Sequence, residues 1–590
     1  MVAKAYSNND IAVVAWNPGK KLEGCMGFCV ERIDMVHGSR TVLPSWVGFA
    51  GDPDSKPKVN PDGTSKRVRK TTDEWPIQKF VWRDFTAQAG GRYQYKITQM
   101  VRDDSGKLVE GEWTATSNEV ELTPVVSPHV ACYFNRGILS TQAITEKVPL
   151  SKDKKTGQMV RASGWLRKRL NTAGDPTRMR LGGALINALQ IPLERAKAVG
   201  GQVHAALYEL NDPDLVRALH TPVTNLILTD AGTDDATNKD SRAALHQPGV
   251  VASIRNRFMP KGHIGHNKFI VCSDSKGRGE AVLSGSTNWT FTGTCGQSNN
   301  AVLVQDNGLA SAYLEYWNAL NKDTVDSGNE GPELPTSANL TNGPQRSAFR
   351  ASNAAHPVDA KVDGAAVRIW FSPNSPVYNK SPGKPPSAVD LDEINKLIGN
   401  AKEGVIFLAF QPGTPSVVDA IAAAKEANPK LFVRGAATSG TVASGFNTSL
   451  YHRETSKADL VVTATQIKDD FDYWAKELLK LGFAVIHDKV VVIDPFSDDC
   501  VVITGSHNLG VRASTNNDEN LLIIKGHRKL AAAYATHVMD VYDHYRWRFQ
   551  LQSQPHEAAF AGLDPTPKWQ DKYFVQGGTP TQEVAFWLGA

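Results

Sequence analysis

Short apolar runs separated by turn residues dominate the first 125 residues of the chain. The runs IAVVAW, GFCVERID, RYQYKITQM and NEVEL are divided by segments rich in Gly, Pro and Asp. In RYQYKI every second position is apolar or aromatic, so Tyr93, Tyr95 and Ile97 fall on one face of a strand. This pattern predicts an all-β domain over residues 1–125.

From residue 126 the pattern changes to apolar runs of strand length that alternate with helical segments. Such alternation is typical of an α/β fold, in which helices cover a sheet. It extends over residues 126–330 and again over 366–550. The segment 331–365 is rich in Pro, Ser, Asn and Gly and lacks an apolar period, which predicts a linker. We expect the tail, 551–590, to pack back on the body through its tryptophans.

The all-β pattern resembles that of a fibronectin type III or immunoglobulin-like sandwich. By this resemblance Trp16 lies in the core between two sheets, and Tyr93 is the corner tyrosine near the start of a late strand. We expect such a domain to space or dock something rather than to carry chemistry.

The two α/β segments repeat each other in sequence. VACYFNRG matches VRIWFSPN, HNKFIVCSD matches HDKVVVID, AVLSGSTNWT matches VVITGSHNLG, and NNAVLV matches ENLLII. The order is the same in both segments, so chance is a poor explanation. We therefore predict two α/β halves of one fold, related by an approximate two-fold axis.

Composition narrows the class of protein without deciding it. The 590 residues are 41% hydrophobic and 21% charged, with a net charge of +4, which suits a soluble protein of several domains with an anionic substrate. No run approaches the ~18 apolar residues of a membrane span, and the start lacks the features of a signal peptide. We expect a cytoplasmic protein, or one that is trimmed or exported by a non-classical route. The six cysteines are too scattered for a disulfide framework.

Each half contains a histidine and a lysine two residues apart in an apolar run. In the second half His487, Lys489 and Asp494 form H-x-K-x4-D, and the spacing of two places the histidine and lysine on one face of a strand. In the first half the same spacing places Ser273 at the aspartate position and Asp274 one residue later. A β-bulge between Lys268 and Asp274 would accommodate the extra residue. The motif G-S-x-N follows in both halves.

This double pattern resembles the phospholipase D superfamily, over residues 126–550. The resemblance implies one cleft between two α/β domains, where one histidine attacks phosphorus and the other protonates the leaving alcohol. Lysine, asparagine and serine side chains then hold the non-bridging oxygens. The catalytic residues that match are His266, Lys268, Asp274, Asn288, His487, Lys489, Asp494, Asn508 and Glu519, and the matching substrate-binding residues are Ser286 and Ser506. Apart from the resemblance, Trp289 is a candidate substrate-binding residue in an apolar wall at the cleft mouth, with packing in the core as an equal alternative.

Physical chemistry agrees with a reaction that needs no metal or other cofactor. A phosphodiester carries one negative charge, which two ammonium groups and several neutral donors can stabilise in the transition state. Histidine titrates near neutrality, so one imidazole can attack while the other donates a proton. The motifs lack the carboxylate cluster of a magnesium site.

One difference between the halves bears on the roles of the histidines. Asn299 and Glu519 lie fourteen residues after Gly285 and Gly505, so they occupy equivalent positions. By the resemblance, each reaches the histidine of the other half. Glu519 then orients His266 as the nucleophile, and Asn299 faces His487, the general acid. Pairing within one half would exchange the roles.

The sequence leaves the substrate open. A phospholipase D-like hydrolase that releases phosphatidic acid, with transphosphatidylation as a variant, is favoured because both half-sites lie on one chain. The alternatives are a metal-independent nuclease, a phosphatidyl-transferring synthase and a degenerate binding module, the last disfavoured by two intact histidine–lysine pairs. We expect a monomer that contacts a membrane surface transiently.

Overall fold

The fold is that of a computed structural model. It describes residues 2–55, 58–59, 65–66, 68–136, 148–152, 159–161, 164–231, 235–328, 343–378, 387–438, 461–463, 486–553 and 562–589. None of the described helices is both long and apolar enough to span a bilayer.

The N-terminal region consists of antiparallel sheets, as the alternating pattern predicted. One sheet has the order β1-β2-β9, and a second has the order β11-β10-β3-β4. Trp16 is fully buried in the core, and Tyr93 is buried with its hydroxyl accepting a hydrogen bond from the Gln88 amide at 3.3 Å. The strands are Ala3–Ser7 (β1), Ala12–Trp16 (β2), Gly27–Asp34 (β3), Arg40–Val42 (β4), Val81–Asp84 (β9), Arg92–Arg102 (β10) and Leu108–Thr116 (β11).

The first α/β half contains an eight-stranded mixed sheet of order β13-β14-β23-β22-β21-β17-β18-β19. Its strands are Val125–Ser127 (β13), Val130–Phe134 (β14), Val203–Leu207 (β17), Thr224–Thr229 (β18), Ser253–Arg257 (β19), Lys268–Ser273 (β21), Gly279–Gly285 (β22) and Asn300–Val304 (β23). The helices are Trp165–Leu170 (α2), Pro176–Ala188 (α3), Ile191–Val199 (α4), Pro213–Leu219 (α5), Lys239–Leu245 (α6), Phe291–Cys295 (α7) and Asn307–Ser327 (α8).

The second half repeats this topology strand by strand. Its sheet has the order β24-β25-β31-β30-β29-β26-β27-β28, with the short strand β20 (Ile264–Gly265) of the first half added to β31. The strands are Val358–Val362 (β24), Ala365–Ser372 (β25), Gly404–Ala409 (β26), Phe432–Ala437 (β27), Val461–Thr463 (β28), Val490–Ile493 (β29), Val501–Gly505 (β30) and Asn517–Lys525 (β31). The helices are Ser347–Ala355 (α9), Val389–Gly399 (α10), Val417–Ala427 (α11), Val511–Asn516 (α13) and Arg528–Ser553 (α14).

Part of the predicted linker is folded, which corrects that prediction. Within 331–365 the structure contains α9 and β24, and β24 pairs with β25 along its whole length. Phe349 of α9 is buried and stacks against Tyr316 of α8. The polar composition hid these elements because α9 contributes few apolar side chains and β24 is an edge strand.

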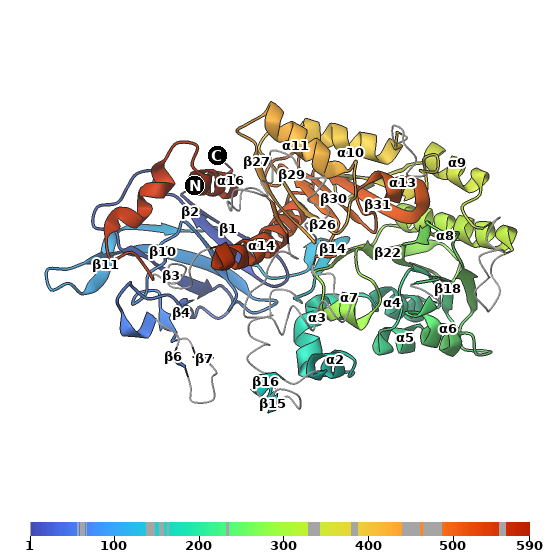
Figure 1. Cartoon of the computed structure of the whole chain (residues 1–590), viewed down its shortest axis with the longest axis horizontal. Helices are drawn as coiled ribbons and strands as arrows, with labels where there is room; N and C mark the ends of the chain where they lie inside the picture. Colours follow the sequence, from blue (N-terminus) through green and yellow to red (C-terminus); the bar gives the residue numbers. More distant parts are fainter. Residues whose placement is uncertain are drawn as a thin grey trace.

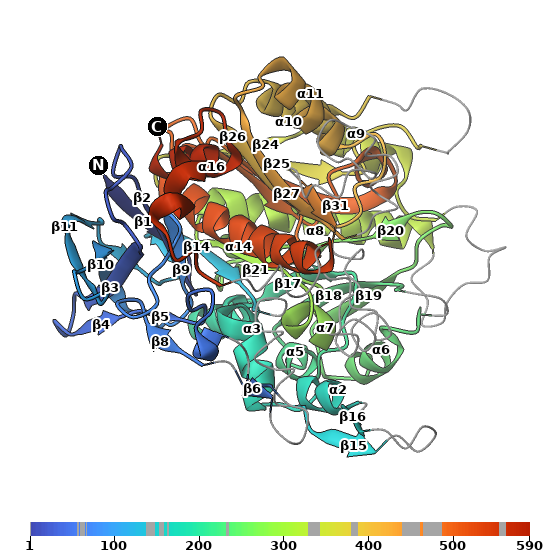
Figure 2. The ribbon, with the colours of Figure 1, turned by 60° about the vertical axis from the view of Figure 1, so that its left-hand side comes forward.

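A single cluster of buried apolar side chains extends from the N-terminal strands through both halves. Helix α14 packs on β27 of its own half and also on β1 and β14, so it joins the three regions (Figure 1 and Figure 2). The tail contributes the 3-10 helix Pro567–Phe574 (η5) and α16 (Thr579–Leu588). Its Trp569 donates from the indole nitrogen to the Cys25 carbonyl at 2.9 Å, and Trp587 is fully buried.

Candidate active site

The two H-x-K segments are held in place by the opposite halves of the molecule. The His266 amide donates to the Asp518 carbonyl of the second half at 2.9 Å, just after β20 pairs with β31. The His487 amide donates to the Ser298 carbonyl of the first half at 3.1 Å. These reciprocal backbone contacts bring both motifs to the junction of the two sheets.

Each imidazole also takes its side-chain partner from the opposite half. His266 Nδ1 lies 2.8 Å from Glu519 Oε2, and His487 Nδ1 lies 3.0 Å from Asn299 Oδ1. The cross-half pairing predicted from the sequence is therefore present, and pairing within one half is not. A partner on Nδ1 fixes the ring orientation and leaves Nε2 to face a reacting group.

The Asn299 amide has one assignment that satisfies its neighbours. Its nitrogen donates to the Gly293 carbonyl at 2.9 Å, and its oxygen accepts from the Ser286 hydroxyl at 2.7 Å. The oxygen that faces His487 is thus an acceptor, so His487 Nδ1 carries a hydrogen. Glu519 is a carboxyl group at the equivalent place, and burial raises its pKa to about 7.

The two lysines lie beside the histidines, and the charge of each lysine acts on both imidazoles. Lys268 Nζ donates to the His266 carbonyl at 2.7 Å, and Lys489 Nζ donates to the His487 carbonyl at 2.6 Å. Burial lowers the pKa of Lys268 to about 7 and that of Lys489 well below its usual value. Burial, followed by the charges of both lysines, also holds the pKa of each imidazole well below its usual value. The protonation states of the two histidines and the two lysines are therefore coupled.

An aromatic ring flanks each histidine–lysine pair at matching positions. The Tyr208 ring centroid lies 5.0 Å from that of His266 and 5.2 Å from Lys268 Nζ. The Phe410 centroid lies 4.7 Å from both the His487 centroid and Lys489 Nζ. The ring faces offer each ammonium group a cation–π contact in place of water.

The serines of the G-S-x-N motifs contact protein groups, so the prediction that they bind substrate directly needs correction. Both are fully buried. The Ser286 hydroxyl donates to Asn299 and accepts from the Asn300 amide at 3.1 Å. The Ser506 hydroxyl accepts from the Asn520 amide at 3.0 Å and bonds to the Glu519 carboxyl group. They position the partners of the histidines.

The asparagines of the same motifs remain candidates for binding a substrate oxygen. Asn288 donates from its amide nitrogen to the Glu209 carboxylate. Within the described part of the chain, the buried Oδ1 atoms of Asn288 and Asn508 have no hydrogen-bond partner. A phosphoryl oxygen accepts hydrogen bonds, so it can bind only the amide nitrogens of these side chains. The unpaired Oδ1 atoms can bind only a donor, such as a water or hydroxyl group.

The two aspartates of the motifs lie at the ends of strands, away from the histidines. Asp494 accepts hydrogen bonds from the backbone amides of Lys402, Glu403 and Gly404 at 2.9, 2.7 and 2.8 Å. It follows β29, whereas Lys489 precedes that strand, so five residues of extended chain, about 16 Å at ~3.3 Å per residue, separate them. Asp494 shapes the strand end, and these contacts give no support to a catalytic role, which stays a prediction.

Asp274 does not replace Asp494 either. The predicted register shift is present between Cys272 and Ser273, but the residue without a partner is Glu280 on the neighbouring strand. Asp274 accepts from the amides of Lys276 and Arg278 in its own hairpin turn, and it pairs with the Arg278 guanidinium at 2.7 Å. The extra residue thus gives the hairpin a different turn, and the contacts of Asp274 lie within that turn.

Trp289 belongs to the core of the first half and does not line the site, which corrects the third substrate-binding prediction. Its side chain is 1% exposed and packs in the cluster that contains Leu210 and Leu283. Its backbone accepts from the Asn211 amide at 3.0 Å. A tryptophan after G-S-x-N therefore anchors a loop here.

Asn300 and Asn520, which were not predicted from the sequence, connect the two halves through side-chain hydrogen bonds. The Asn300 oxygen accepts from Thr504 at 2.8 Å and Tyr534 at 2.9 Å, both of the second half. The Asn520 oxygen accepts from Ser284 and, at 3.1 Å, from Tyr313, both of the first half. Each amide nitrogen donates to the middle residue of the opposite H-x-K motif, to Asp488 and Asn267 respectively. The signal was an identical asparagine at matching positions of the repeat.

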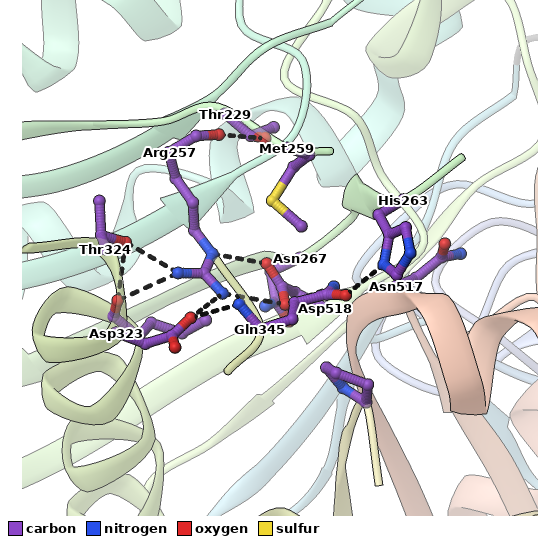
Figure 3. Close-up of polar contacts among 12 residues, drawn as sticks. Thr229, Arg257, Met259, His263, Asn267, Asp323, Thr324, Gln345, Asn517 and Asp518 are labelled. Carbon is purple, nitrogen blue, oxygen red and sulfur yellow. Dashed lines mark hydrogen bonds and ion pairs between the residues drawn. The ribbon is translucent and has the colours of Figure 1, made fainter. Parts of the chain in front are cut away.

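A buried arginine fixes the strand that carries Glu519. Figure 3 shows Arg257 reaching from β19 between Asp323 of α8 and Asp518 of β31. The ion pairs measure 2.9 Å to Asp323 and 2.7 Å to Asp518, and Gln345 adds an amide donor to Asp518 at 3.0 Å. Burial alone would lower the pKa of the Arg257 guanidinium, but the charges of the surrounding carboxylates raise it above its usual value. Arg257 therefore stays protonated although it is buried.

A comparison with known protein families matches most of the second half. Residues 394–541 match the family model described as "Cardiolipin synthase, PLD-like domain". This range contains the second H-x-K motif, the second G-S-x-N motif and Glu519. The chain thus carries a phospholipase D-like domain. No curated protein sequence matches the chain.

Solved structures with partial likeness include three from this superfamily. Phosphatidylserine synthase from Haemophilus influenzae is 12% identical with a TM-score of 0.41, over 68% of this chain and 93% of that protein. Nuc from Salmonella typhimurium is 20% identical with a TM-score of 0.22, over 30% and 95%. Yeast tyrosyl-DNA phosphodiesterase is 10% identical with a TM-score of 0.29, over 56% and 85%.

Proposed function

We propose that the chain hydrolyses phosphodiesters through a phosphohistidine formed on His266. The observation that carries this proposal is the exchange of partners between the halves, in which Glu519 contacts His266 and Asn299 contacts His487. Two imidazoles with their Nδ1 atoms engaged, next to two lysines, supply a nucleophile, a proton donor and positive charge in one site.

In the first step the Nε2 lone pair of His266 attacks phosphorus and the bond to the leaving oxygen breaks. The proton on His487 Nε2 passes to that oxygen, so the headgroup leaves as a neutral alcohol. In the second step His487 takes a proton from water, the water oxygen attacks phosphorus, and the P–N bond returns its electrons to His266. The lysine ammonium groups and the Asn288 and Asn508 amides stabilise the non-bridging oxygens.

The difference between the Nδ1 partners supports the assignment of roles. A carboxylate at 2.8 Å stabilises the positive charge that His266 gains when its Nε2 binds phosphorus. A neutral amide oxygen gives His487 less stabilisation as a cation, so it releases its proton more readily. The anionic substrate itself offsets the lysine charges that depress the pKa of His487.

We propose a phospholipid as the substrate, with phosphatidic acid and a headgroup alcohol as products. The rings of Tyr208 and Phe410 beside the two histidine–lysine pairs support a substrate with apolar flanks. A second alcohol in place of water would give transphosphatidylation by the same second step. A single-stranded nucleic acid would present charged flanks to the same rings.

The test is a parallel assay of the purified full chain in EDTA, on phosphatidylcholine vesicles and on single-stranded DNA. We expect choline release, its loss in His266→Ala, and its retention in the matched control His356→Ala, an exposed histidine that bonds only the Ser352 carbonyl among the described contacts. Cleavage of DNA without choline release would reverse the choice of substrate. Retained activity in His266→Ala would overturn the mechanism.

A further inference from the structure

The proposed reaction leaves one carboxylate of the site without a role. Glu209 follows β17, and its carboxylate accepts a hydrogen bond from Asn288, a proposed ligand of the phosphoryl oxygens. The backbone of Glu209 also accepts from the Trp289 amide at 3.0 Å, which fixes the loop against the G-S-x-N segment. The equivalent residue of the second half is Gln411, which is exposed. Only the first half therefore places a carboxylate at this position.

The surroundings of Glu209 are mostly cationic. Its charge interacts with Lys268 of β21 and with Lys489, which directly precedes β29. Burial, followed by the charge of Glu209, also raises the pKa of the neighbouring Tyr208 hydroxyl. Glu519 interacts with both lysines from the opposite side.

A bound phosphodiester adds a like charge beside the Glu209 carboxylate. The histidines, the lysines and Glu519 of this site are at most 3% exposed, so water screens the repulsion between the two negative charges only weakly. The Glu209 carboxylate is also the group that holds Asn288, so it competes with the substrate oxygens for that donor. Glu519 is already engaged by His266, so Glu209 is the carboxylate whose protonation removes a conflict.

We propose that Glu209 takes up one proton from solvent when a phosphodiester binds, which makes it a specificity-determining residue of the site. This inference rests on the proposed function. The protonated carboxyl group no longer repels the anionic substrate, and it becomes a hydrogen-bond donor to a non-bridging oxygen while Asn288 is released to a second one. Release of the product returns the proton to solvent, so the cycle balances.

The direction of the Glu209 pKa agrees with this role. Burial raises the pKa of the carboxyl group, and the charge of Lys268, the Asn288 amide and the charge of Lys489 oppose that rise. A bound phosphate anion acts in the same direction as burial. Binding linked to the uptake of one proton weakens tenfold for each pH unit above the pKa of free Glu209.

The test uses dimethyl phosphate, which remains a monoanion across the useful pH range, and the full chain. Calorimetric titrations in two buffers of different ionisation enthalpy give the number of protons taken up on binding. At a pH above the Glu209 pKa we expect the wild type to take up about one proton more than Glu209→Gln, because the proton that His487 needs as general acid enters both proteins. The affinity of Glu209→Gln should depend less on pH and should exceed that of the wild type at the alkaline end. Gln411→Glu is the matched control and should keep the wild-type proton uptake.

Each other outcome overturns the proposal. Binding by the wild type without proton uptake, or an absence of binding, removes its basis without any variant. Equal proton uptake by the wild type and Glu209→Gln assigns the protons to His487, a lysine or Glu519. The assay of choline and DNA tests the proposed function separately, so an inactive chain that still binds dimethyl phosphate with one proton refutes the function and not this inference.

Discussion

Replacement of Glu519 by glutamine should make the protein less active and, above neutral pH, more stable. The carboxyl group is fully buried, and burial raises its pKa from 4.5 to about 7 against the opposing charge of Lys268. A gap of about 2.5 pKa units corresponds to about 3 kcal/mol. The glutamine keeps the shape and one acceptor for His266, but it carries no charge.

The sign of the pH dependence follows from the raised pKa. Stability contributed by a protonated Glu519 is fully present below pH 4.5, falls by about 1.4 kcal/mol per pH unit above it, and is lost once the pH passes about 7. The variant lacks this loss. The stability advantage of Glu519→Gln should therefore be near zero at pH 4.5 and approach about 3 kcal/mol at pH 8.

Chemical denaturation of the wild type and the variant from pH 4.5 to pH 8.5 measures this difference. In parallel, phosphodiester hydrolysis by the variant should fall by about 10²–10⁴, because the amide stabilises no positive charge on His266. Identical stability profiles for the two proteins would show that Glu519 carries no cost of a buried charge in the folded state. Unchanged hydrolysis would show that His266 does not depend on that charge.

Three further outcomes are expected. In His487→Asn, which cannot protonate a poor leaving group, an activated nitrophenyl phosphodiester should leave a covalent phosphoryl group on His266, located by mass spectrometry; a label elsewhere contradicts the assignment of roles. Hydrolysis by the wild type should be unchanged in excess EDTA, and loss that a divalent ion reverses would refute a reaction through histidine alone. Asp494→Asn should lower the free energy of unfolding by about 1–3 kcal/mol, because one of its oxygens is replaced by a donor that faces a backbone amide, while kcat stays close to that of the wild type; a large loss of kcat at full stability would return Asp494 to the catalytic set.

The part of the site that could be predicted from sequence consists of the motifs that occur once in each half. Two H-x-K motifs and two G-S-x-N motifs at a constant offset constrain the strands that carry them, and the strand order of the two sheets is the same. The contact of Glu519 with His266 followed from the same offset combined with the resemblance. A repeat identifies equivalent positions in the two halves. When the halves are related by an approximate two-fold axis, a contact from the first half to the second has a counterpart from the second half to the first.

The errors arose where a residue's type was taken for its role. The presence of an aspartate in a motif does not tell at which end of a strand its side chain lies. Asp494 was therefore predicted to be catalytic, whereas in the structure it accepts hydrogen bonds from backbone amides. The serine hydroxyls and Trp289 lie next to the site in sequence, but they are buried and contact other protein groups. Composition also concealed β24, since an edge strand needs few apolar residues.

The differences between the halves carry more functional content than their likeness. A duplicated site with two equal halves would offer two equivalent histidines and no preference for the nucleophile. This chain breaks the equivalence three times: a carboxylate faces His266 where an amide faces His487, Glu209 stands opposite Gln411, and Asp488 with its His537 partner stands where Asn267 pairs with Tyr316. The first difference places a carboxylate beside His266. In the proposed reaction its negative charge favours the cationic phosphohistidine on that ring, so this asymmetry would give the reaction its direction through the site.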